Sequence, residues 1–349
     1  MPEKPLNHVG VIDLFCGAGG LTAGMEREGL KVVAGLDVDA ACRFPYQRNN
    51  RARFVERDVG GVQASDLFEL WRNVELRVLV GCAPCQPFSR YTQGRSADKD
   101  ERWRLLDSFA KLVTETMPAI VSMENVEALT KHQVHADFLR QLLNLGYVLD
   151  QQIVECSAYG IPQMRRRLVM LASRIGPIRL LTPIEFGEGP KTVMDEIGHL
   201  PPLAAGEVHP SDPLHRSSRL SPLNLARIKQ SRPGGSWREW QSNLVASCHQ
   251  RAAGKGYGSV YGRMEWHRVA PTITTQAFAF GSGRFGHPEQ DRAISLREAA
   301  ILQTFPPDYR FVEEGHAVTM KTVGRLIGNA VPVRLGQLIG RSIVNTLVS

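Results

Sequence analysis

The feature that most constrains the fold is an alternation, along the first half of the chain, of short β-prone apolar runs with stretches of helical period. Between the apolar runs, hydrophobic residues of 105–117 and 138–143 recur at helical spacing, and Gly146 stands where the second helix would end. Strands that alternate with helices form a mostly parallel sheet covered on both faces. The sequence therefore predicts an α/β fold with strands at Val9–Phe15, Val32–Leu36, Val78–Val80, Ala119–Met123, Tyr147–Val154 and Leu168–Ala172.

The texture of the chain changes after Pro183. Pro, Gly, Ser and Arg become frequent, and the alternation disappears until about residue 295. Apolar residues of 335–343 then have the spacing of a helix, which we expect to pack on the first domain. We therefore predict a first domain of 1–182 plus 320–349, a smaller loop-rich domain of 183–293 with a small aromatic core, and a connecting segment of 294–319.

Positive charge is concentrated in the second part of the chain. Residues 1–159 hold 18 Lys and Arg against 21 Asp and Glu, whereas residues 160–349 hold 24 against 14. Between Pro213 and Arg284 the only acids are Glu239 and Glu265. A basic surface of this kind attracts a polyanion, most often a nucleic acid, although a solvated basic face explains the charge alone equally well.

The cysteines and the apolar runs limit the cellular compartment in which we expect the protein. Six scattered cysteines argue against a disulfide framework. Cys82 and Cys85 form a C-x-x-C, which could be a metal knuckle or a redox pair, but no second pair completes a zinc site at the usual spacing, and we predict no metal. No apolar run approaches the roughly 18–20 residues that span a bilayer. Met1–His8 lacks the regions of a signal peptide, so we expect a cytoplasmic protein.

A glycine-rich turn follows the first predicted strand. The strand runs directly into Cys16-Gly17-Ala18-Gly19-Gly20 and then into a helix. Glycines at such a turn let a ligand approach the backbone and leave helix N–H groups free. Asp37, at the end of the next strand, stands where an acid can bind both hydroxyls of a ribose. The pattern indicates a nucleoside cofactor; its G-x-G-G spacing favours S-adenosylmethionine over NAD without excluding NAD.

Further blocks stand after the later strands. Gly81-Cys82-Ala83-Pro84-Cys85-Gln86 follows one strand, Glu124-Asn125-Val126 ends another, and Gln163–Arg167 comes next. With Asp13–Gly20, Ile294–Phe305 and Gly328-Asn329-Ala330-Val331-Pro332, these blocks occur in the order of the bacterial DNA cytosine-5 methyltransferase family, which the chain strongly resembles. The resemblance spans Asp13 to Pro332. It implies a Rossmann-like S-adenosylmethionine-dependent methyltransferase domain with a smaller, loop-rich DNA target-recognition domain.

The resemblance assigns catalytic roles. C5 of cytosine is a poor nucleophile, and addition of a thiolate to C6 converts the ring into an enamine-like species whose C5 can attack the methyl donor. Cys85 matches the family's nucleophile. Glu124 would act at N3 of the cytosine, Arg165 would bind the carbonyl oxygen, and Arg167 would support that site. The sequence does not show which group removes the C5 proton.

Cofactor contacts follow from the same resemblance. Asp58 resembles the family acid that hydrogen-bonds the adenine amine, although a lone acid after a strand is weak evidence. The last two contacts would come from a C-terminal segment that folds back onto the first domain. The full set of cofactor residues that the resemblance implies is Phe15, Gly17, Gly19, Asp37, Val38, Asp58, Pro84, Leu105, Asn329 and Val331.

The target cytosine must leave the duplex to meet both Cys85 and the methyl donor. The segment Gln86–Arg102 is polar and lacks apolar periodicity, so we interpret it as a lid over the flipped base. Ser89 and Tyr91 are candidates to enter the vacated space, with ordinary loop chemistry as the alternative. Gln86, Asn125 and Gln163 are candidate DNA or substrate contacts; Asn125 and Gln163 could instead hold loops.

Three other functions would each explain part of the sequence. A tRNA cytosine-5 methyltransferase would share the fold, but the sizeable basic region favours duplex DNA. A silent binding module has no chemical need for Cys85, Glu124, Arg165 and Arg167 together, and a nicotinamide oxidoreductase explains only the glycine block. We expect a monomer that acts on one double-stranded DNA sequence near the nucleoid, with no membrane partner. Whether it accompanies a restriction endonuclease, belongs to a phage-defence operon or acts alone is a genomic question.

Overall fold

The computed structural model describes residues 6–84, 103–251, 254 and 256–348. Contacts divide the chain into two compact units. The first unit comprises Met1–Tyr159, Arg166–Glu188 and Val331–Ser349, and the second comprises Gly160–Arg165 and Gly189–Ala330. Contacts thus assign residues 160–165 and 294–330 to the second unit, whereas composition placed the functional boundaries at 183, 294 and 320; those functional boundaries remain a prediction.

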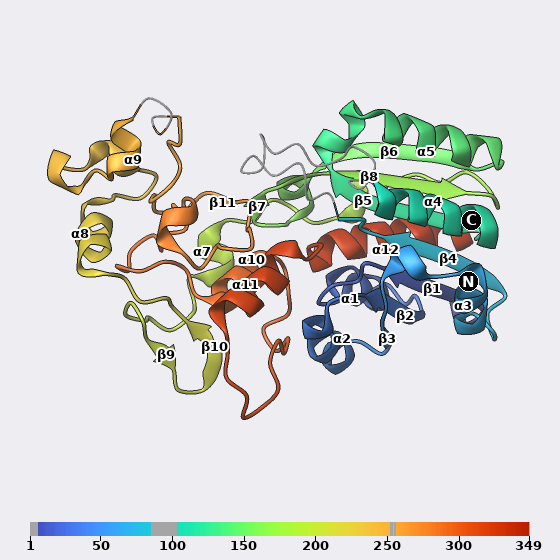
Figure 1. Cartoon of the computed structure of the whole chain (residues 1–349), viewed down its shortest axis with the longest axis horizontal. Helices are drawn as coiled ribbons and strands as arrows, with labels where there is room; N and C mark the ends of the chain where they lie inside the picture. The colour runs from blue at the N-terminus through green and yellow to red at the C-terminus, as the bar shows by residue number, and fades with distance from the viewer. Residues whose placement is uncertain (1–5, 85–102, 252–253, 255, 349) are drawn as a thin grey trace. The chain divides into compact units, whose positions relative to one another are not determined.

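The first unit is built on a seven-stranded sheet with strand order β3-β2-β1-β4-β5-β8-β6 (Figure 1). Neighbouring strands from β3 to β5 are parallel, and β8 runs antiparallel to both of its neighbours. The mostly parallel sheet and the α/β class are therefore confirmed. The strands are β1 (Val9–Leu14), β2 (Val32–Asp37), β3 (Arg53–Glu56), β4 (Leu76–Gly81), β5 (Ile120–Val126), β6 (Val148–Glu155) and β8 (Arg166–Ser173).

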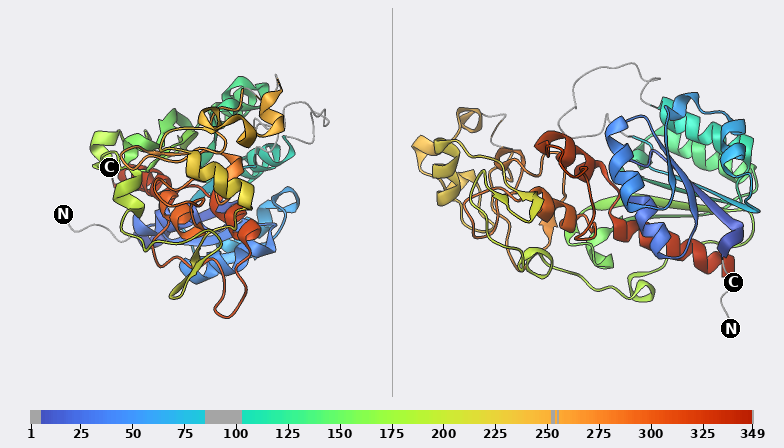
Figure 2. Two further views of the ribbon diagram at one scale, coloured as in Figure 1. Left: turned by 90° about the vertical axis from the view of Figure 1, so that its left-hand side faces the viewer. Right: turned by 90° about the horizontal axis from the view of Figure 1, so that it is seen from below.

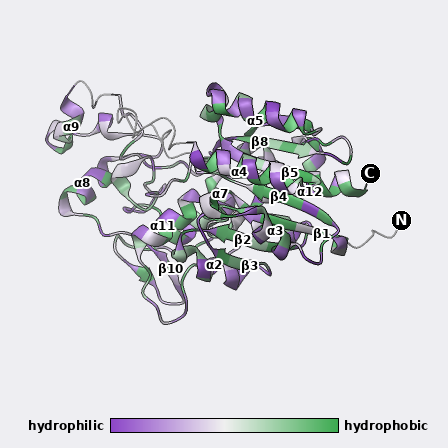
Figure 3. Ribbon diagram, turned by 45° about the vertical axis from the view of Figure 1, so that its right-hand side comes forward, coloured by the Kyte–Doolittle hydropathy of each residue, from purple (hydrophilic) through white to green (hydrophobic). Residues whose placement is uncertain are grey.

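Alternating side chains of β1 face the two sides of the sheet. Ile12 and Leu14 enter a core that includes Phe109 and Phe138, whereas Asp13 accepts a hydrogen bond from Thr22 Oγ1 at 2.7 Å. Figure 3 shows the strands as mainly hydrophobic, while α4 and α5 alternate hydrophobic and hydrophilic positions. The helices of this unit are α1 (Gly20–Arg27), α2 (Arg43–Asn49), α3 (Ala64–Leu70), α4 (Arg104–Thr116), α5 (Gln133–Asn144), α6 (Pro183–Phe186) and α12 (Val333–Val348).

The C-terminal helix α12 packs against α1, as the apolar spacing of 335–343 predicted (Figure 2). The helices approach closely because glycines face one another. A Cβ atom built on Gly24 would lie 2.3 Å from the Val333 carbonyl oxygen, and one on Gly336 would lie 2.8 Å from the Leu21 carbonyl oxygen. Beside this crossing, Arg341 Nε lies 2.8 Å from Glu28 Oε2. Tertiary contact therefore joins the two ends of the described chain in one unit.

The second unit contains short elements joined by long loops. Trp237, Trp240 and Phe280 belong to its aromatic core together with Ile228 and Val260. This fits the expectation that aromatic residues of the region mainly form a small core. None of the helices within the described ranges is both long and apolar enough to cross a membrane. The elements are β7 (Gln163–Met164), α7 (Val193–Ile197), β9 (Val208–His209), β10 (Asp212–Arg216), α8 (Pro222–Gln230), α9 (Ser247–Gln250), β11 (Ala270–Pro271), α10 (Leu296–Leu302) and α11 (Met320–Asn329).

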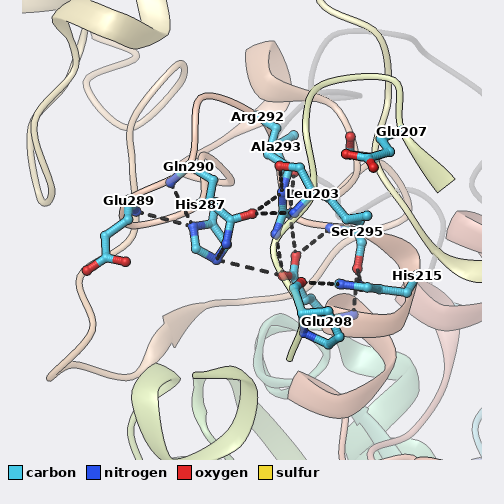
Figure 4. Close-up of polar contacts among 12 residues, drawn as sticks. Leu203, Glu207, His215, His287, Glu289, Gln290, Arg292, Ala293, Ser295 and Glu298 are labelled. Carbon is cyan, nitrogen blue, oxygen red and sulfur yellow. Dashed lines mark hydrogen bonds and ion pairs between the residues drawn. The ribbon is translucent and has the colours of Figure 1, made fainter. Parts of the chain in front are cut away.

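A buried polar cluster fastens the start of α10 within the second unit (Figure 4). Arg292 donates two hydrogen bonds to the Glu298 carboxylate, each 2.7 Å long, and both side chains are almost fully buried. The Ser295 N–H donates to Glu298 Oε2 at 2.6 Å, which completes a capping box. His287 Nε2 lies 3.7 Å from Glu298 Oε1, and burial lowers the pKa of His287 to about 4. Glu298 is therefore held from several directions.

Candidate active site

The glycine-rich turn after β1 adopts a conformation that glycine favours. Phe15, Gly17 and Gly19 have φ angles of 61°, 52° and 91°. The Cys16 N–H donates to the Leu36 carbonyl oxygen at 3.0 Å, which ties the turn to β2. No atom would lie within 4 Å of a Cβ atom built on Gly17. The open space beside Gly17 leaves room for a ligand to approach the backbone, and the cofactor role of this turn stays a prediction.

Asp37, at the end of β2, lies against this turn. Its Oδ2 accepts a hydrogen bond from the Gly17 N–H at 2.9 Å, and its Oδ1 accepts one from the Asp39 N–H at 2.9 Å. Burial raises the pKa of Asp37, and these two bonds oppose the shift. The next residue, Val38, is 67% exposed. An acid with further acceptor capacity, an open glycine turn and an exposed apolar side chain together suit a nucleoside with a ribose and a base.

Asp58 follows β3 at the same edge of the sheet. Its Oδ1 accepts a hydrogen bond from the Gly60 N–H at 2.9 Å, and Arg104 Nη2 lies 3.3 Å from its Oδ2. Leu105 follows Arg104 in the first turn of α4 and is partly buried. Sequence reasoning missed the Asp58–Arg104 pair, because no motif marks Arg104. The ion pair between Asp58 and Arg104 therefore brings Asp58 close to the first turn of α4, where Leu105 lies.

Glu124 is the acid of the predicted catalytic set. It lies in β5, is 2% exposed, and accepts a hydrogen bond at Oε2 from the Cys82 thiol, with Sγ 2.7 Å away. Arg167 Nε lies 3.1 Å from Oε1, an ion pair without the alignment of a hydrogen bond. Antiparallel pairing explains this meeting, because β8 places Arg167 opposite Val126, two residues after Glu124. The structure therefore joins two of the predicted catalytic residues.

The segment that leads from β4 toward Cys85 is tied to β5. Asn125 Nδ2 donates to the Ala83 carbonyl oxygen at 3.2 Å, and Asn125 Oδ1 accepts from the Val126 N–H at 2.8 Å. These bonds fit the loop-holding alternative for Asn125. Pro84 is exposed. The whole predicted lid, Gln86–Arg102, lies outside the described part of the chain, and so do four predicted site residues: Cys85, Gln86, Ser89 and Tyr91.

Cys82, the first cysteine of the C-x-x-C, directly follows β4. It is only partly buried, and its thiol contacts the carboxylate of Glu124. Nothing local in the C-x-x-C spacing indicates this contact, since the two residues are 42 positions apart. The parallel pairing of β4 with β5 brings the two strand ends together.

Gln163 and Arg165 belong to the second unit, whereas Arg167 belongs to the first. Gln163 is fully buried; its Nε2 donates to Leu302 O and Gln303 Oε1, both at 2.9 Å, and its Oε1 accepts from Ile273 N–H at 3.1 Å. Its amide therefore serves internal contacts, which fits the loop-holding alternative.

Arg165 is also buried. Its Nη1 donates to the Ile273 carbonyl oxygen at 3.3 Å and its Nη2 to the Ala330 carbonyl oxygen at 3.4 Å. Between the two predicted arginines, Arg166 is exposed and forms a 3.2 Å ion pair with Glu127. Arg166 is thus solvent-exposed, whereas Arg165 is buried.

The predicted cofactor contacts near the C-terminus fall in different units. Asn329 is exposed at the end of α11 in the second unit, and Val331 is buried in the first. A Cβ atom built on Gly328 would lie 2.2 Å from the Thr275 backbone nitrogen, so close packing within the second unit demands glycine there.

Comparison with known proteins agrees with the motifs. A family model described as C-5 cytosine-specific DNA methylase matches residues 9–345. Type II methylase M.HgiDII of Herpetosiphon aurantiacus is 50% identical over 336 residues, which cover 95% of this chain and 94% of that protein. Type II methyltransferase M.Eco47II of Escherichia coli is 31% identical over 345 residues, covering 97% and 79%.

Solved structures share the fold. A crystal structure of a putative DNA modification methyltransferase encoded within an E. coli prophage superposes with a TM-score of 0.75 at 22% identity, covering 98% of this chain and 100% of the other. The structure of a Spodoptera frugiperda DNMT2 mutant superposes with a TM-score of 0.61 at 18% identity, covering 96% and 99%.

Proposed function

Since this chain belongs to the family of C-5 cytosine-specific DNA methylases, we propose that it moves a methyl group from S-adenosylmethionine to C5 of a flipped cytosine in one short duplex DNA sequence. The reaction would proceed through a covalent bond between Cys85 and C6. The observation that carries this proposal is the buried Glu124, which contacts Cys82 and Arg167. Glu124 lies in β5, which pairs with β4, and Cys85 comes shortly after β4 in the sequence. A carboxyl group so placed suits chemistry on the base next to the nucleophile.

Cys85 would act as the nucleophile. A free cysteine, with a pKa near ~8.5, is only a few per cent thiolate at neutral pH, so nearby positive charge favours the reactive form. Thiolate addition would form the S–C6 bond and move an electron pair toward C5. C5 would then bond to the methyl group as that group's bond to the donor's sulfonium sulfur breaks, and the donor would leave as a neutral thioether. Loss of the C5 proton and expulsion of the thiolate restore the aromatic ring and free Cys85.

Glu124 would share a proton with N3 and so offset the charge that builds on the ring during addition. Arg167 contributes a positive charge beside its carboxylate. We assign Arg165 to the carbonyl oxygen of cytosine, on the strength of its motif. Burial already orders its guanidinium, so little side-chain entropy would remain to be lost on binding.

Residues at the β1, β2 and β3 ends fit the methyl donor, which supplies the electrophilic methyl group when bound. Asp37 would accept hydrogen bonds from the ribose hydroxyls, and Asp58 would accept one from the adenine amine. Gly17 and Gly19 would let the ligand approach the backbone, and Val38 would cover the base. Further contacts are proposed for Phe15, Pro84, Leu105, Asn329 and Val331.

DNA would be held by the basic second part of the chain. Residues 183–293 are proposed as the target-recognition domain, in which Arg and Gln side chains read base edges while other basic residues contact phosphates. Gln86, Ser89 and Tyr91 remain proposed contacts near the flipped base. The relatives are named type II methylases, which favours a cognate restriction endonuclease encoded nearby over a solitary enzyme; we propose a monomer associated with the nucleoid.

Conversion sequencing of a methylation-free bacterial genome after expression of the chain tests this function. We expect protected cytosines at one short motif with the wild-type protein and none with Cys85→Ala. Cys156→Ala is the matched control, because Cys156 is a buried thiol elsewhere in the first unit. Protection by Cys85→Ala would refute the nucleophile, and methylated tRNA without methylated DNA would favour the RNA alternative.

DNA containing 5-fluorocytosine at the target tests the covalent step. Fluorine cannot leave as a proton does, so the adduct should persist through denaturation, and peptide mapping should locate it at Cys85. An adduct at another cysteine would contradict the assignment of the Cys85 loop.

A further inference from the structure

The thiol of Cys82 makes a contact that the proposed reaction does not use. Its Sγ lies 2.7 Å from Glu124 Oε2 and donates a hydrogen bond to it. A thiol can donate only while it carries its proton, and a neighbouring carboxylate disfavours a second negative charge at that point. The contact therefore places an S–H donor on one oxygen of the Glu124 carboxylate.

The two oxygens of Glu124 are held differently. Arg167 Nε approaches Oε1 as an ion pair at 3.1 Å without hydrogen-bond alignment. An ion pair of that kind fixes the distance of a charge better than the plane of the carboxylate, because Coulomb attraction is not directional. The thiol forms a hydrogen bond with the other oxygen, and because hydrogen bonds are directional this contact restrains rotation about the terminal bond of the glutamate.

Hydrogen bonds near the end of β4 hold the backbone at Cys82 in a fixed position. Cys82 follows β4 directly, and its N–H donates to the Leu14 carbonyl oxygen at 3.3 Å. The carbonyl oxygen of the next residue, Ala83, accepts a hydrogen bond from the Asn125 side chain. Backbone and side-chain bonds thus hold the donor in position before the chain continues toward Pro84. A donor on a fixed backbone loses little freedom when it orients its acceptor.

We propose that Cys82 is a positioning residue that orients the Glu124 carboxylate toward the cytosine through its S–H donor. This inference rests on the proposed function, because it assigns Glu124 to the base. The alternative is that Cys82 only fills space at the end of β4. The positioning role and the space-filling role predict different activities for a variant whose side chain at position 82 has a similar size but no hydrogen-bond donor.

Three substitutions separate them. Cys82→Ser keeps a donor, Cys82→Val keeps bulk without a donor, and Cys82→Ala removes both. We expect Val and Ala to lower kcat about tenfold to a hundredfold, since a hydrogen bond to a charged group is lost. KM for DNA and for S-adenosylmethionine should change little, and Ser should restore most of kcat. Cys156→Ala, which removes a buried thiol elsewhere, should match the wild type.

An infrared measurement decides the contact independently of activity. In the wild-type protein the S–H stretching band that Cys82→Ser removes should lie at lower frequency than that of an unbonded thiol. In Glu124→Ala it should move back toward the unbonded position. A band unaffected by Glu124→Ala, or full kcat in Cys82→Val, would overturn the positioning role. A wild-type protein that shows the band shift but methylates no DNA would refute the proposed function while supporting the contact.

Discussion

At the residue scale, two adjacent arginines have opposite environments. The Arg167 side chain is 16% exposed and faces a glutamate that is 2% exposed, whereas Arg166 is 58% exposed and pairs with the half-exposed Glu127. Removing one partner of a buried pair leaves an uncompensated buried charge, while an exposed pair contributes little because solvent screens it. Alternation along β8 accounts for the contrast, since successive side chains leave a strand on opposite faces.

We therefore expect Arg167→Ala to lower the free energy of unfolding by about 3 kcal/mol, the low end for a broken buried pair. Arg166→Ala, the matched control, should cost less than about 1 kcal/mol. Urea unfolding of the two variants checks this. Equal losses in both would show that Arg167 contributes no more than a surface arginine.

At the element scale, the α1–α12 contact depends on the absence of side chains. Alanine usually favours a helix over glycine by about 1 kcal/mol. At Gly24, however, the added Cβ would lie 2.3 Å from a backbone oxygen of α12 that cannot move alone. We expect Gly24→Ala to destabilise the protein by about 1–3 kcal/mol, because overpacking outweighs propensity.

Gly61→Ala is the control for that prediction, since no atom would lie within 4 Å of its Cβ and its φ is not in the left-handed region. It should be close to neutral in thermal unfolding. If Gly24→Ala raised the melting temperature instead, the close crossing of α1 and α12 would be wrong.

The buried cluster before α10 predicts an acid response of the second unit. Burial lowers the pKa of His287 to about 4, from 6.5 in the unfolded chain. Between these values the unfolded state binds the proton more readily, so stability falls as pH drops from about 6.5 to about 4. Above about 6.5 the neutral imidazole makes stability independent of this group.

We expect His287→Gln to flatten this acid dependence relative to the wild type. Hydrogen exchange of the α10 amides at pH 7 and pH 5 measures it, with His316→Gln as the control because His316 is exposed. An unchanged difference between the two pH values in His287→Gln would contradict the assignment of the response to His287.

At the scale of the whole molecule, the distribution of charge matters more than its total. The net charge is +7, but residues 1–159 are net acidic and residues 160–349 carry the excess of basic residues. If that part of the chain neutralises DNA phosphates, binding releases counterions and weakens with salt. We expect the Kd for target DNA to rise by at least about tenfold between 50 and 200 mM salt.

Fluorescence anisotropy with labelled duplex DNA measures this dependence. A Kd that stays the same across these salt concentrations would show that the basic residues do not contact phosphates. The same titration with DNA that lacks the target motif gives the nonspecific reference, whose salt dependence should be similar because phosphates dominate it.

Much of the first unit could be predicted because its signals are local. Burial of both faces makes the central strands read as continuous apolar runs, and helical spacing marked α4, α5 and α12. β3 was missed because only Phe54 of its four residues is buried, so its apolar signal is short. The ordered motifs identified the family, because each needs particular residue types for its chemistry.

Local signals could not show which strand ends meet. Glu124 meets Cys82 because β4 pairs with β5, and it meets Arg167 because β8 lies antiparallel beside β5. Asp58 meets Arg104 because the turn after β3 packs on α4. Periodicity and motifs are local properties of the chain, so they were enough to predict the α/β class, the family and the candidate residues. Which side chains form ion pairs or hydrogen bonds with one another depends on the tertiary structure, because strand order and register set the distances between side chains far apart in sequence.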